Sequence, residues 1–227
     1  QKTKSNFKIS NFLIYVLLAT ICDVMPLRKI NKIIARNTIN NFKIQNNLAL
    51  NYIFEQYSLK KKLTVDDLGF LIGPIINSGG RLNSSNYGVE LLSTDNLEII
   101  KDRSSKLIAL NNKRKIIEQN ILDKVDFEKL KKENKNVIIY YKENLNEGLI
   151  GIIASRLKDY FNKPSIVITK SNDKLKASGR STSSYNFGYL IKSLIDKNII
   201  DSGGGHNMAA GFTMKKTNLK LLDNFIQ

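Results

Sequence analysis

The sequence predicts an α/β protein with an all-helical first part and an α/β second part. Over most of the first 132 residues, apolar side chains recur every three or four positions, which is the period of an amphipathic helix. From residue 137 onward, short runs of β-branched and aromatic residues alternate with helical segments. A hydrophobic fraction of 42% in 227 residues is enough to form a core.

The first part is expected to begin with a buried helix at residues 10–25, which contains the apolar run 12–22. Asp23 closes this run, and Pro26 disfavours helix at the residue before it. Residues 28–57 are also helical in pattern, with apolar side chains three or four positions apart. We therefore expect packed helices here.

Thr64 predicts the N-cap of a short helix over 65–72, because its hydroxyl can accept from first-turn N–H groups. Gly73-Pro74 is expected to end that helix and leave residues 75–85 irregular. The apolar positions from 97 to 121 predict one long helix of about 35 residues, reaching residue 132.

The second part is expected to contain a parallel strand–helix–strand unit. Its strands are predicted at 137–141 and 165–169, and Asn146 is expected to cap its helix at 148–161. The remaining elements are expected as a strand at 175–178, a helix at 187–197 and a strand at 212–214. The domain division that follows is a helical domain at 1–95, a connecting helix at 96–134 and an α/β domain at 135–227.

The chain is strongly basic. Lys and Arg total 36 against 20 Asp and Glu, which gives a formal net charge of +16. This balance favours binding to a polyanion, with nucleic acid as the first candidate. The abundance of Lys, Asn and Ile is also what an AT-rich genome produces, so compositional drift is an alternative source of part of the charge.

Cys22 is the single cysteine, which excludes an internal disulfide or a cysteine-based zinc site. It favours a reducing compartment, so we expect a cytoplasmic protein. The apolar run at 12–22 is too short to cross a bilayer, and no membrane association is expected.

Three glycines at 203–205 precede His206, the only histidine. Glycines expose backbone N–H groups, and a histidine adds a further donor, so the segment can cradle an oxyanion such as phosphate. The competing interpretation is a flexible glycine turn beside an incidental histidine.

Three other segments carry polar groups suited to phosphate chemistry. Asp23, at a helix end, is either a local hydrogen-bond acceptor or a metal ligand. The segment 77–81 offers the Arg81 guanidinium as a phosphate clamp, or is a solvated surface loop. Ser178 and Arg180 follow a predicted strand and suit phosphate contact, although a plain turn is the alternative.

Together these segments resemble the DHH phosphoesterase family, and within it the RecJ-type single-stranded-DNA exonucleases. Residues 203–211, GGGHNMAAG, are similar to the signature of the DHH-associated domain. Four more segments are similar to RecJ-type motifs and occur in the family's order: 19–27, 73–82, 147–157 and 178–181. The resemblance implies the C-terminal part of a helical DHH catalytic lobe, joined by a long helix to an α/β DHH-associated domain with a mixed sheet.

The resemblance also implies roles for individual residues. Asp23 matches the last aspartate ligand of a two-metal centre that usually holds Mn²⁺ or Mg²⁺. Asn77 and Arg81 match a loop facing the active-site cleft. Asp23 and His206 are thus the implied catalytic residues, and the terminal phosphate of the substrate is implied to be held by Ser178, Arg180, Gly204, Gly205 and His206.

The sequence departs from the family's pattern at several points. Ile75 stands where the family often has arginine, and Leu145-Asn146 where it often has Trp-His. The family's Asp-x-Asp and Asp-His-His motifs lie upstream of the segment matching Asp23, and a chain with one histidine cannot contain Asp-His-His. The resemblance therefore predicts a protein truncated at both ends that is inactive by itself.

For the intact enzyme, the resemblance implies a metal-dependent hydrolase that removes nucleotides 5′-to-3′ from single-stranded DNA in repair and recombination. A monomer is expected, with a single-strand-binding protein or a helicase as candidate partners. Two other functions stay open. One is an oligonucleotide or cyclic-dinucleotide phosphodiesterase of the DHH family, and the other is a non-catalytic nucleic-acid-binding module.

Overall fold

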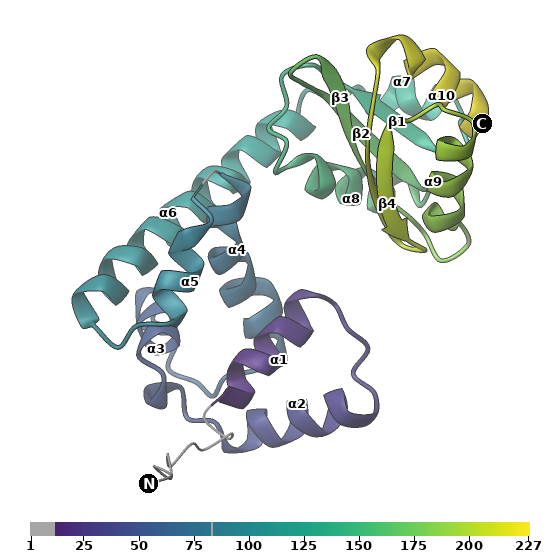
Figure 1. Cartoon of the computed structure of the whole chain (residues 1–227). Helices are drawn as coiled ribbons and strands as arrows, with labels where there is room; N and C mark the ends of the chain where they lie inside the picture. Colours follow the sequence, from purple (N-terminus) through teal and green to yellow (C-terminus); the bar gives the residue numbers. More distant parts are fainter. Residues whose placement is uncertain (1–11, 83) are drawn as a thin grey trace, which may run out of the picture. The chain divides into compact units, whose positions relative to one another are not determined.

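The computed structural model describes residues 12–82 and 84–227 (Figure 1). The chain divides into two compact units, Gln1–Lys113 and Arg114–Gln227, which we call the N-terminal and C-terminal units. Described elements of the first are all helical, and the second contains a five-stranded sheet, so the expected α/β class is confirmed. No helix in the described part of the chain is long and apolar enough to cross a membrane.

The N-terminal unit is a set of packed helices around one hydrophobic core. Leu17, Leu50, Ile53 and Phe54 are almost fully buried in it. Its elements are α1 (Leu13–Cys22), α2 (Lys29–Asn41), the 3₁₀-helix η2 (Ile44–Asn46), α3 (Leu48–Gln56), the π-helix η3 (Asp67–Ile72), α4 (Gly73–Arg81), α5 (Asn86–Leu92) and the first part of α6 (Leu97–Leu122).

The helix expected at 10–25 is confirmed as α1 but ends earlier, at Cys22, and residues 10 and 11 lie outside the described residues. The helical pattern over 28–57 is divided into α2, η2 and α3. The break between α2 and α3 follows from the backbone of Phe42, Lys43 and Asn47, which is extended. The side chain of Asn47 then caps α3 by accepting from the N–H of Leu50. The spacing of apolar residues continues across the break, but the capping side chain of Asn47 starts a new helix there.

The expected irregular segment at 75–85 is wrong, because Gly73-Pro74 does not end the preceding helix. Residues 65–81 are helical throughout, with the π-turn η3 directly before α4. Proline lacks an N–H and usually breaks a helix interior, but here it occupies the first turn of α4 after the π-turn has shifted the hydrogen-bond register. Gly73 is required where it stands, because a Cβ there would lie 2.5 Å from Sγ of Cys22.

The N-cap predicted at Thr64 is confirmed as a reciprocal capping pair with Asp67. The Thr64 hydroxyl accepts from the Asp67 N–H at 3.2 Å, and the Asp67 carboxylate accepts from the Thr64 N–H at 2.9 Å. Burial raises the pKa of Asp67, but hydrogen bonds from Lys61 and Thr64 and the charge of Lys61 outweigh it and hold the pKa below its usual range.

Replacing Asp67 by Asn should therefore lower the free energy of unfolding by about 1 kcal/mol at neutral pH. A folded-state pKa below the unfolded value of about 3.9 means that the stabilisation is complete above that value and disappears as the pH falls through the folded pKa. The measurement is urea unfolding at neutral and acidic pH. The exposed neighbour Asp66, changed to Asn, is the control, and an effect of Asp67→Asn that persists in acid would contradict the capping role of the carboxylate.

The long helix predicted to reach residue 132 is shorter than expected. Helix α6 ends at Leu122, and a separate helix α7 (Phe127–Lys132) follows. The break is caused by a second N-cap, since Asp126 accepts from the N–H of Lys129 at 2.8 Å.

The C-terminal unit contains one mixed sheet in the order β1-β2-β3-β5-β4. Strand β1 runs parallel to β2, as the predicted strand–helix–strand unit requires, and all other neighbours are antiparallel. Its elements beyond α7 are β1 (Ile138–Tyr141), α8 (Ile150–Phe161), β2 (Ser165–Ser171), β3 (Lys174–Arg180), α9 (Phe187–Asp196), β4 (Ser202–His206), β5 (Ala209–Met214), the 3₁₀-helix η4 (Lys216–Asn218) and α10 (Leu219–Ile226).

Alternate residues of the strands face two different hydrophobic clusters. Val167 packs with the apolar face of α8, whereas Ile166 and Ile168 pack with α9 and α10. Helix α8 packs on one face of the sheet, where it contacts β2 and β3. It does not cover β5 and β4 on that face. Because side chains of a strand alternate between the two faces, only every second side chain of β3 lies on the face that α8 contacts.

The glycine run 203–205 was expected to be a loop, but it lies in strand β4, paired with β5. None of the described glycines has a positive φ, so the run does not serve a left-handed turn. The last strand also begins earlier than predicted, at Ala209 instead of 212. Pairing across the sheet forms these strands in segments that local propensity assigns to loops.

Candidate phosphate-binding site

Four of the predicted site residues lie on one face of the sheet. Ser178 is paired with Gly211, which is paired with Gly204, and Arg180 is paired in the same way through Ala209 with His206. Paired residues of antiparallel strands point to the same face, and neighbouring strands are about 4.8 Å apart, so Arg180 and His206 are about 10 Å apart across the sheet. We call Ser178, Arg180, Gly204 and His206 the anion face.

Arg180 is a half-buried cation without an acidic partner among the described residues. Its guanidinium donates to the Gly179 carbonyl at 2.8 Å and to the Ser178 hydroxyl at 3.2 Å. Burial lowers the pKa of Arg180, because the charged form is partly removed from water. A desolvated guanidinium that faces only neutral acceptors is suited to bind an incoming anion.

The N-terminus of α8 lies against this pair. A Cβ on Gly151 would lie 2.9 Å from Nη2 of Arg180 and 3.1 Å from Oγ of Ser178, so only glycine allows the approach. Asn146 accepts from the N–H of Gly148 at 2.9 Å in the turn before α8, but it is not the predicted cap, because α8 begins at Ile150 and its N-cap is Leu149, which has no side-chain capping hydrogen bond. The first-turn N–H groups and the positive end of the helix dipole add to the charge of Arg180.

His206 contributes a donor at the other end of the anion face. Its Nδ1 accepts the N–H of Met208 at 3.3 Å. With Nδ1 acting as an acceptor, Nε2 is the ring nitrogen available to donate. The side chain is exposed, and the small residues Ala209 and Gly211 separate it from Ser178 and Arg180 without filling the space.

The three glycines of β4 differ in whether a side chain would fit at their positions. A Cβ on Gly203 would lie 2.7 Å from Cβ of Phe212, and one on Gly205 would lie 2.5 Å from the Ala209 carbonyl oxygen. A Cβ on Gly204 would meet no atom within 4 Å. Packing within the chain therefore accounts for Gly203 and Gly205, which face away from the anion face, but it does not account for Gly204.

The remaining predicted residues belong to the N-terminal unit. Asp23 is exposed and directly follows α1, where its N–H bonds to the Ala19 carbonyl. Asn77 and Arg81 are one turn apart on α4, so they share a helix face that is exposed at Asn77 and half-exposed at Arg81. The close contact of Cys22 with Gly73 places the end of α1 against the start of α4.

A two-metal centre does not fit the described residues. Residues 12–82 and 84–227 contain no group of three or more His, Cys, Asp or Glu side chains that could hold a metal ion. Asp23 is a single exposed carboxylate, and Mn²⁺ or Mg²⁺ needs several oxygen ligands. We derive no hydrolytic step through a metal from these residues.

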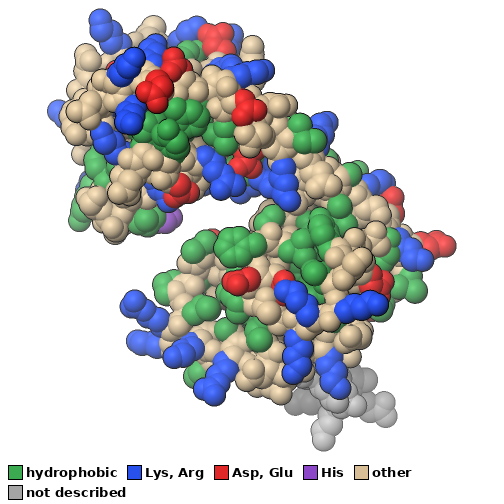
Figure 2. Space-filling view, turned by 180° about the vertical axis from the view of Figure 1, so that it is seen from behind, with side chains coloured by type: hydrophobic (Ala, Val, Ile, Leu, Met, Phe, Trp, Pro, Cys, Tyr) green, Lys and Arg blue, Asp and Glu red, His purple; other side chains and the backbone are tan. Residues whose placement is uncertain are grey.

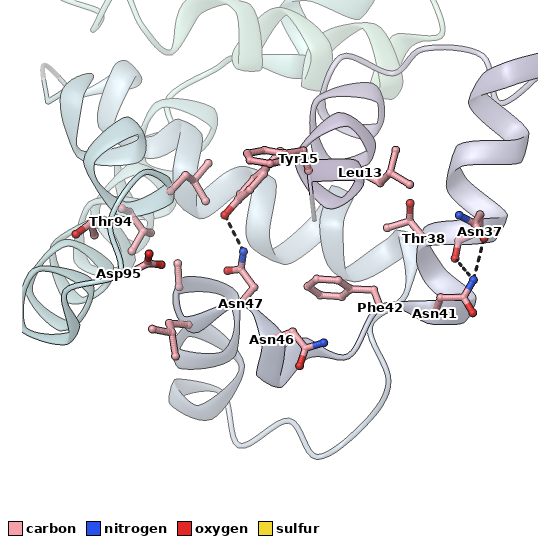
Figure 3. Close-up of a pocket in the computed structure, with 15 residues that line it drawn as sticks. Leu13, Tyr15, Asn37, Thr38, Asn41, Phe42, Asn46, Asn47, Thr94 and Asp95 are labelled. Carbon is pink, nitrogen blue, oxygen red and sulfur yellow. Dashed lines mark hydrogen bonds between the residues drawn. The ribbon is translucent and has the colours of Figure 1, made fainter. Parts of the chain in front are cut away.

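A separate pocket of about 810 Å³ lies among α1, α2, α3 and the end of α5 (Figure 3). Tyr15 accepts a hydrogen bond from Asn47 at 2.8 Å there, and the buried Thr38 hydroxyl has no partner among the described residues. None of its described lining residues is Lys or Arg. Asp95 lines this pocket and no described lining residue is cationic, so the pocket is unsuited to phosphate.

Two contributions to the anion face were missed at the sequence level. The sequence predicts a cap at the start of the helix 148–161, but the approach of Gly151 to Arg180 exists only after α8 packs on β3. The isolation of Arg180 from carboxylates was also invisible, because the chain holds 20 acidic residues that could have paired with it. A glycine in the first turn of the predicted helix is the one sequence feature that indicates such a close approach.

Comparison with known proteins identifies this architecture. Residues 134–227 match the DHHA1 domain. The chain is 31% identical over 218 residues to the single-stranded-DNA-specific exonuclease RecJ of Salmonella typhimurium, covering 92% of this chain and 38% of that protein. It is likewise 31% identical over 223 residues to RecJ of Escherichia coli, covering 94% and 39%.

The fold also matches a solved structure. The crystal structure of RecJ from Thermus thermophilus in complex with Mn²⁺ has a TM-score of 0.82 at 22% identity, covering 96% of this chain and 32% of that one. The chain spans less than two-fifths of the length of the Salmonella and Escherichia relatives. Residues 134–227 are thus similar to the DHHA1 domain, and over most of its length the chain is similar in sequence to the RecJ exonucleases.

Proposed function

We propose that this chain binds single-stranded DNA and holds its terminal phosphate on the anion face, as part of a 5′-to-3′ exonuclease of DNA repair and recombination. The observation that carries this proposal is the half-buried Arg180 without an acidic partner among the described residues, beside the N-terminus of α8. The similarity to RecJ supports single-stranded DNA as the substrate, and the geometry of the anion face supports the terminal phosphate as the group that is bound.

The anion face offers donors from three directions. Arg180 is placed to bind two phosphate oxygens at once, and the Ser178 hydroxyl and Nε2 of His206 can each donate to an oxygen. The bare backbone at Gly204 allows the phosphate to approach the sheet more closely than any side chain would. These residues bind and orient the terminal nucleotide.

In a RecJ-type exonuclease, a two-metal centre would supply the hydrolysis by activating water and stabilising the leaving oxygen. Asp23 is proposed as one ligand, and Asn77 and Arg81 as residues that position the strand. Since the described residues do not form a metal centre, we expect this chain to bind DNA without cleaving it. We further propose a cytoplasmic monomer, with a single-strand-binding protein or a helicase as partners.

The basic charge supports a nucleic-acid ligand but does not locate the site. Figure 2 shows Lys and Arg side chains scattered over the visible face and interspersed with Asp and Glu. A distributed charge of this kind attracts DNA at long range and adds little specificity. The specific contact must come from a built site such as the anion face.

The test of the proposal is binding of a 5′-phosphorylated single-stranded oligonucleotide at increasing salt. If about two phosphates are contacted, the affinity should fall about sevenfold for a fourfold rise in salt, because bound counterions are released from the DNA. An oligonucleotide without the 5′-phosphate should bind more weakly, and a blunt duplex more weakly still. An affinity that does not change with salt would exclude phosphate contact.

Two neighbouring glycines separate ligand binding from packing. Gly205→Ala should lower the free energy of unfolding by about 1–3 kcal/mol, because its Cβ would press on backbone atoms of Ala209 and Ala210. Gly204→Ala should leave stability almost unchanged but weaken binding of the phosphorylated strand. Thermal unfolding and oligonucleotide titration of both variants provide the comparison. Unimpaired binding by a folded Gly204→Ala variant would remove Gly204 from the site.

A further inference from the structure

Strand β1 is an edge of the sheet. The N–H groups of Ile138 and Lys142 bond to the carbonyls of Pro164 and Ile168 on the β2 side. Since residues of a strand alternate in direction, the peptide groups of Val137, Ile139 and Tyr141 point outward, where no strand formed by residues 12–82 or 84–227 pairs with β1.

The first of these outward groups is already paired with a peptide-like amide. The side chain of Gln227 donates to the Val137 carbonyl at 3.0 Å and accepts from the Val137 N–H at 3.5 Å. The carboxamide thus makes the pair of hydrogen bonds that a neighbouring strand would make. The next two outward groups, at Ile139 and Tyr141, line an adjoining groove.

This groove, which we call the β1 groove, has a volume of about 650 Å³. Its floor is the edge of β1, and its sides come from the segment 124–135, which includes α7, and from η4 with the start of α10. The four residues of β1 extend about 13 Å at about 3.3 Å per residue, enough to pair with a short extended segment.

The described side chains that line the β1 groove carry a net positive charge, with five Lys against Asp126, Glu133 and Asp223. Lys124, Lys129 and Lys220 line it, and none of them forms an ion pair within residues 12–82 and 84–227. Lys135 is neutralised by Asp223 at 2.6 Å, and Lys216 by Glu143 at 2.5 Å. The three remaining ammonium groups favour an acidic ligand.

The aromatic side chains of the groove are not arranged as a stacking platform for bases. Tyr140 and Tyr141 are adjacent in β1, so their rings lie on opposite faces of the sheet, where each packs against a different hydrophobic cluster. The Tyr141 hydroxyl also donates to Glu143 at 3.0 Å. The free groups of the floor are backbone donors and acceptors, which a polypeptide strand matches and a nucleic acid does not.

We propose that the β1 groove binds an extended acidic peptide segment of a partner protein, which adds to the sheet as a sixth strand beside β1. Main-chain hydrogen bonds to Ile139 and Tyr141 give the affinity, and Lys124, Lys129 and Lys220 select acidic side chains. This site lies at the edge of the sheet opposite to β4, so it is separate from the anion face, and it does not depend on the proposed nuclease function.

The test uses the full chain and a fluorescent peptide of alternating aspartate and valine. The double variant Lys129→Glu and Lys220→Glu should bind the peptide at least about tenfold more weakly. Lys192→Glu, an exposed lysine of α9 outside the groove, should bind it as the unchanged protein does. Hydrogen exchange at the Ile139 and Tyr141 amides should slow when the peptide is bound.

A second pair of measurements tests the backbone pairing itself. Ile139→Pro removes one outward N–H and none of the β1–β2 hydrogen bonds, so the variant should fold but bind weakly. A peptide N-methylated along its backbone should also fail to bind the unchanged protein. Equal binding of methylated and unmodified peptides, displacement of the peptide by oligothymidylate with the same dependence on Lys129 and Lys220, or no saturable binding up to about 1 mM would overturn the proposal.

Discussion

Replacing Arg180 by methionine should weaken binding of a 5′-phosphorylated single-stranded oligonucleotide by about 10- to 100-fold, because hydrogen bonds to charged groups contribute about 1.5–3 kcal/mol. The stability of the C-terminal unit should not fall, since the variant removes a partly desolvated cation with no acidic partner in the described part of the chain. Fluorescence titration gives the affinity, and urea unfolding gives the stability.

Two matched variants sharpen this result. Lys192→Met removes an equal charge from exposed surface and should change the affinity only slightly. Arg180→Lys keeps the charge but loses the two-pronged geometry of the guanidinium, so its affinity should be intermediate. If Arg180→Met and Lys192→Met weakened binding equally, the anion face would be no more than general basic surface.

Replacing Phe187 by alanine should lower the free energy of unfolding by about 3–5 kcal/mol, the largest effect on stability that we expect from one side chain. Phe187 is fully buried at the start of α9. A Cβ on Gly179 would lie 2.9 Å from its ring, so Phe187 supports β3 directly beneath the residue between Ser178 and Arg180. Urea unfolding followed by circular dichroism measures the loss.

The matched control for this variant is Tyr189→Ala, on the same helix. Tyr189 is 75% exposed, so its removal should change the free energy of unfolding by less than about 0.5 kcal/mol. Because the cavity under Gly179 loosens β3, Phe187→Ala should also weaken phosphate binding under conditions where the protein is folded. Similar losses for the two aromatic residues would contradict the assigned packing.

Elements with a strong local pattern could be predicted from the sequence, and their ends could not. The apolar run of α1, the β-branched runs of β1 and β2, and the helix α8 all form close to where they were expected. The ends of α6 and of the helix beginning at Thr64 were misjudged. The Asp126 cap starts α7 soon after α6 ends, and the π-turn before Pro74 lets the helix that begins after Thr64 continue into α4. Neither feature is visible in the spacing of apolar residues.

The α/β class and the residue types that could bind a phosphate, namely Ser178, Arg180, His206 and the glycines before it, can be derived from the sequence. Which of these residues act together depends on the tertiary structure. Strand pairing put Ser178, Arg180, Gly204 and His206 on one face and turned Gly205 to the other. Packing of α8 left Arg180 half-buried beside a helix N-terminus. The physical reason is that residue type and local propensity are properties of short segments, whereas burial, charge isolation and a shared face depend on which distant segments pack together.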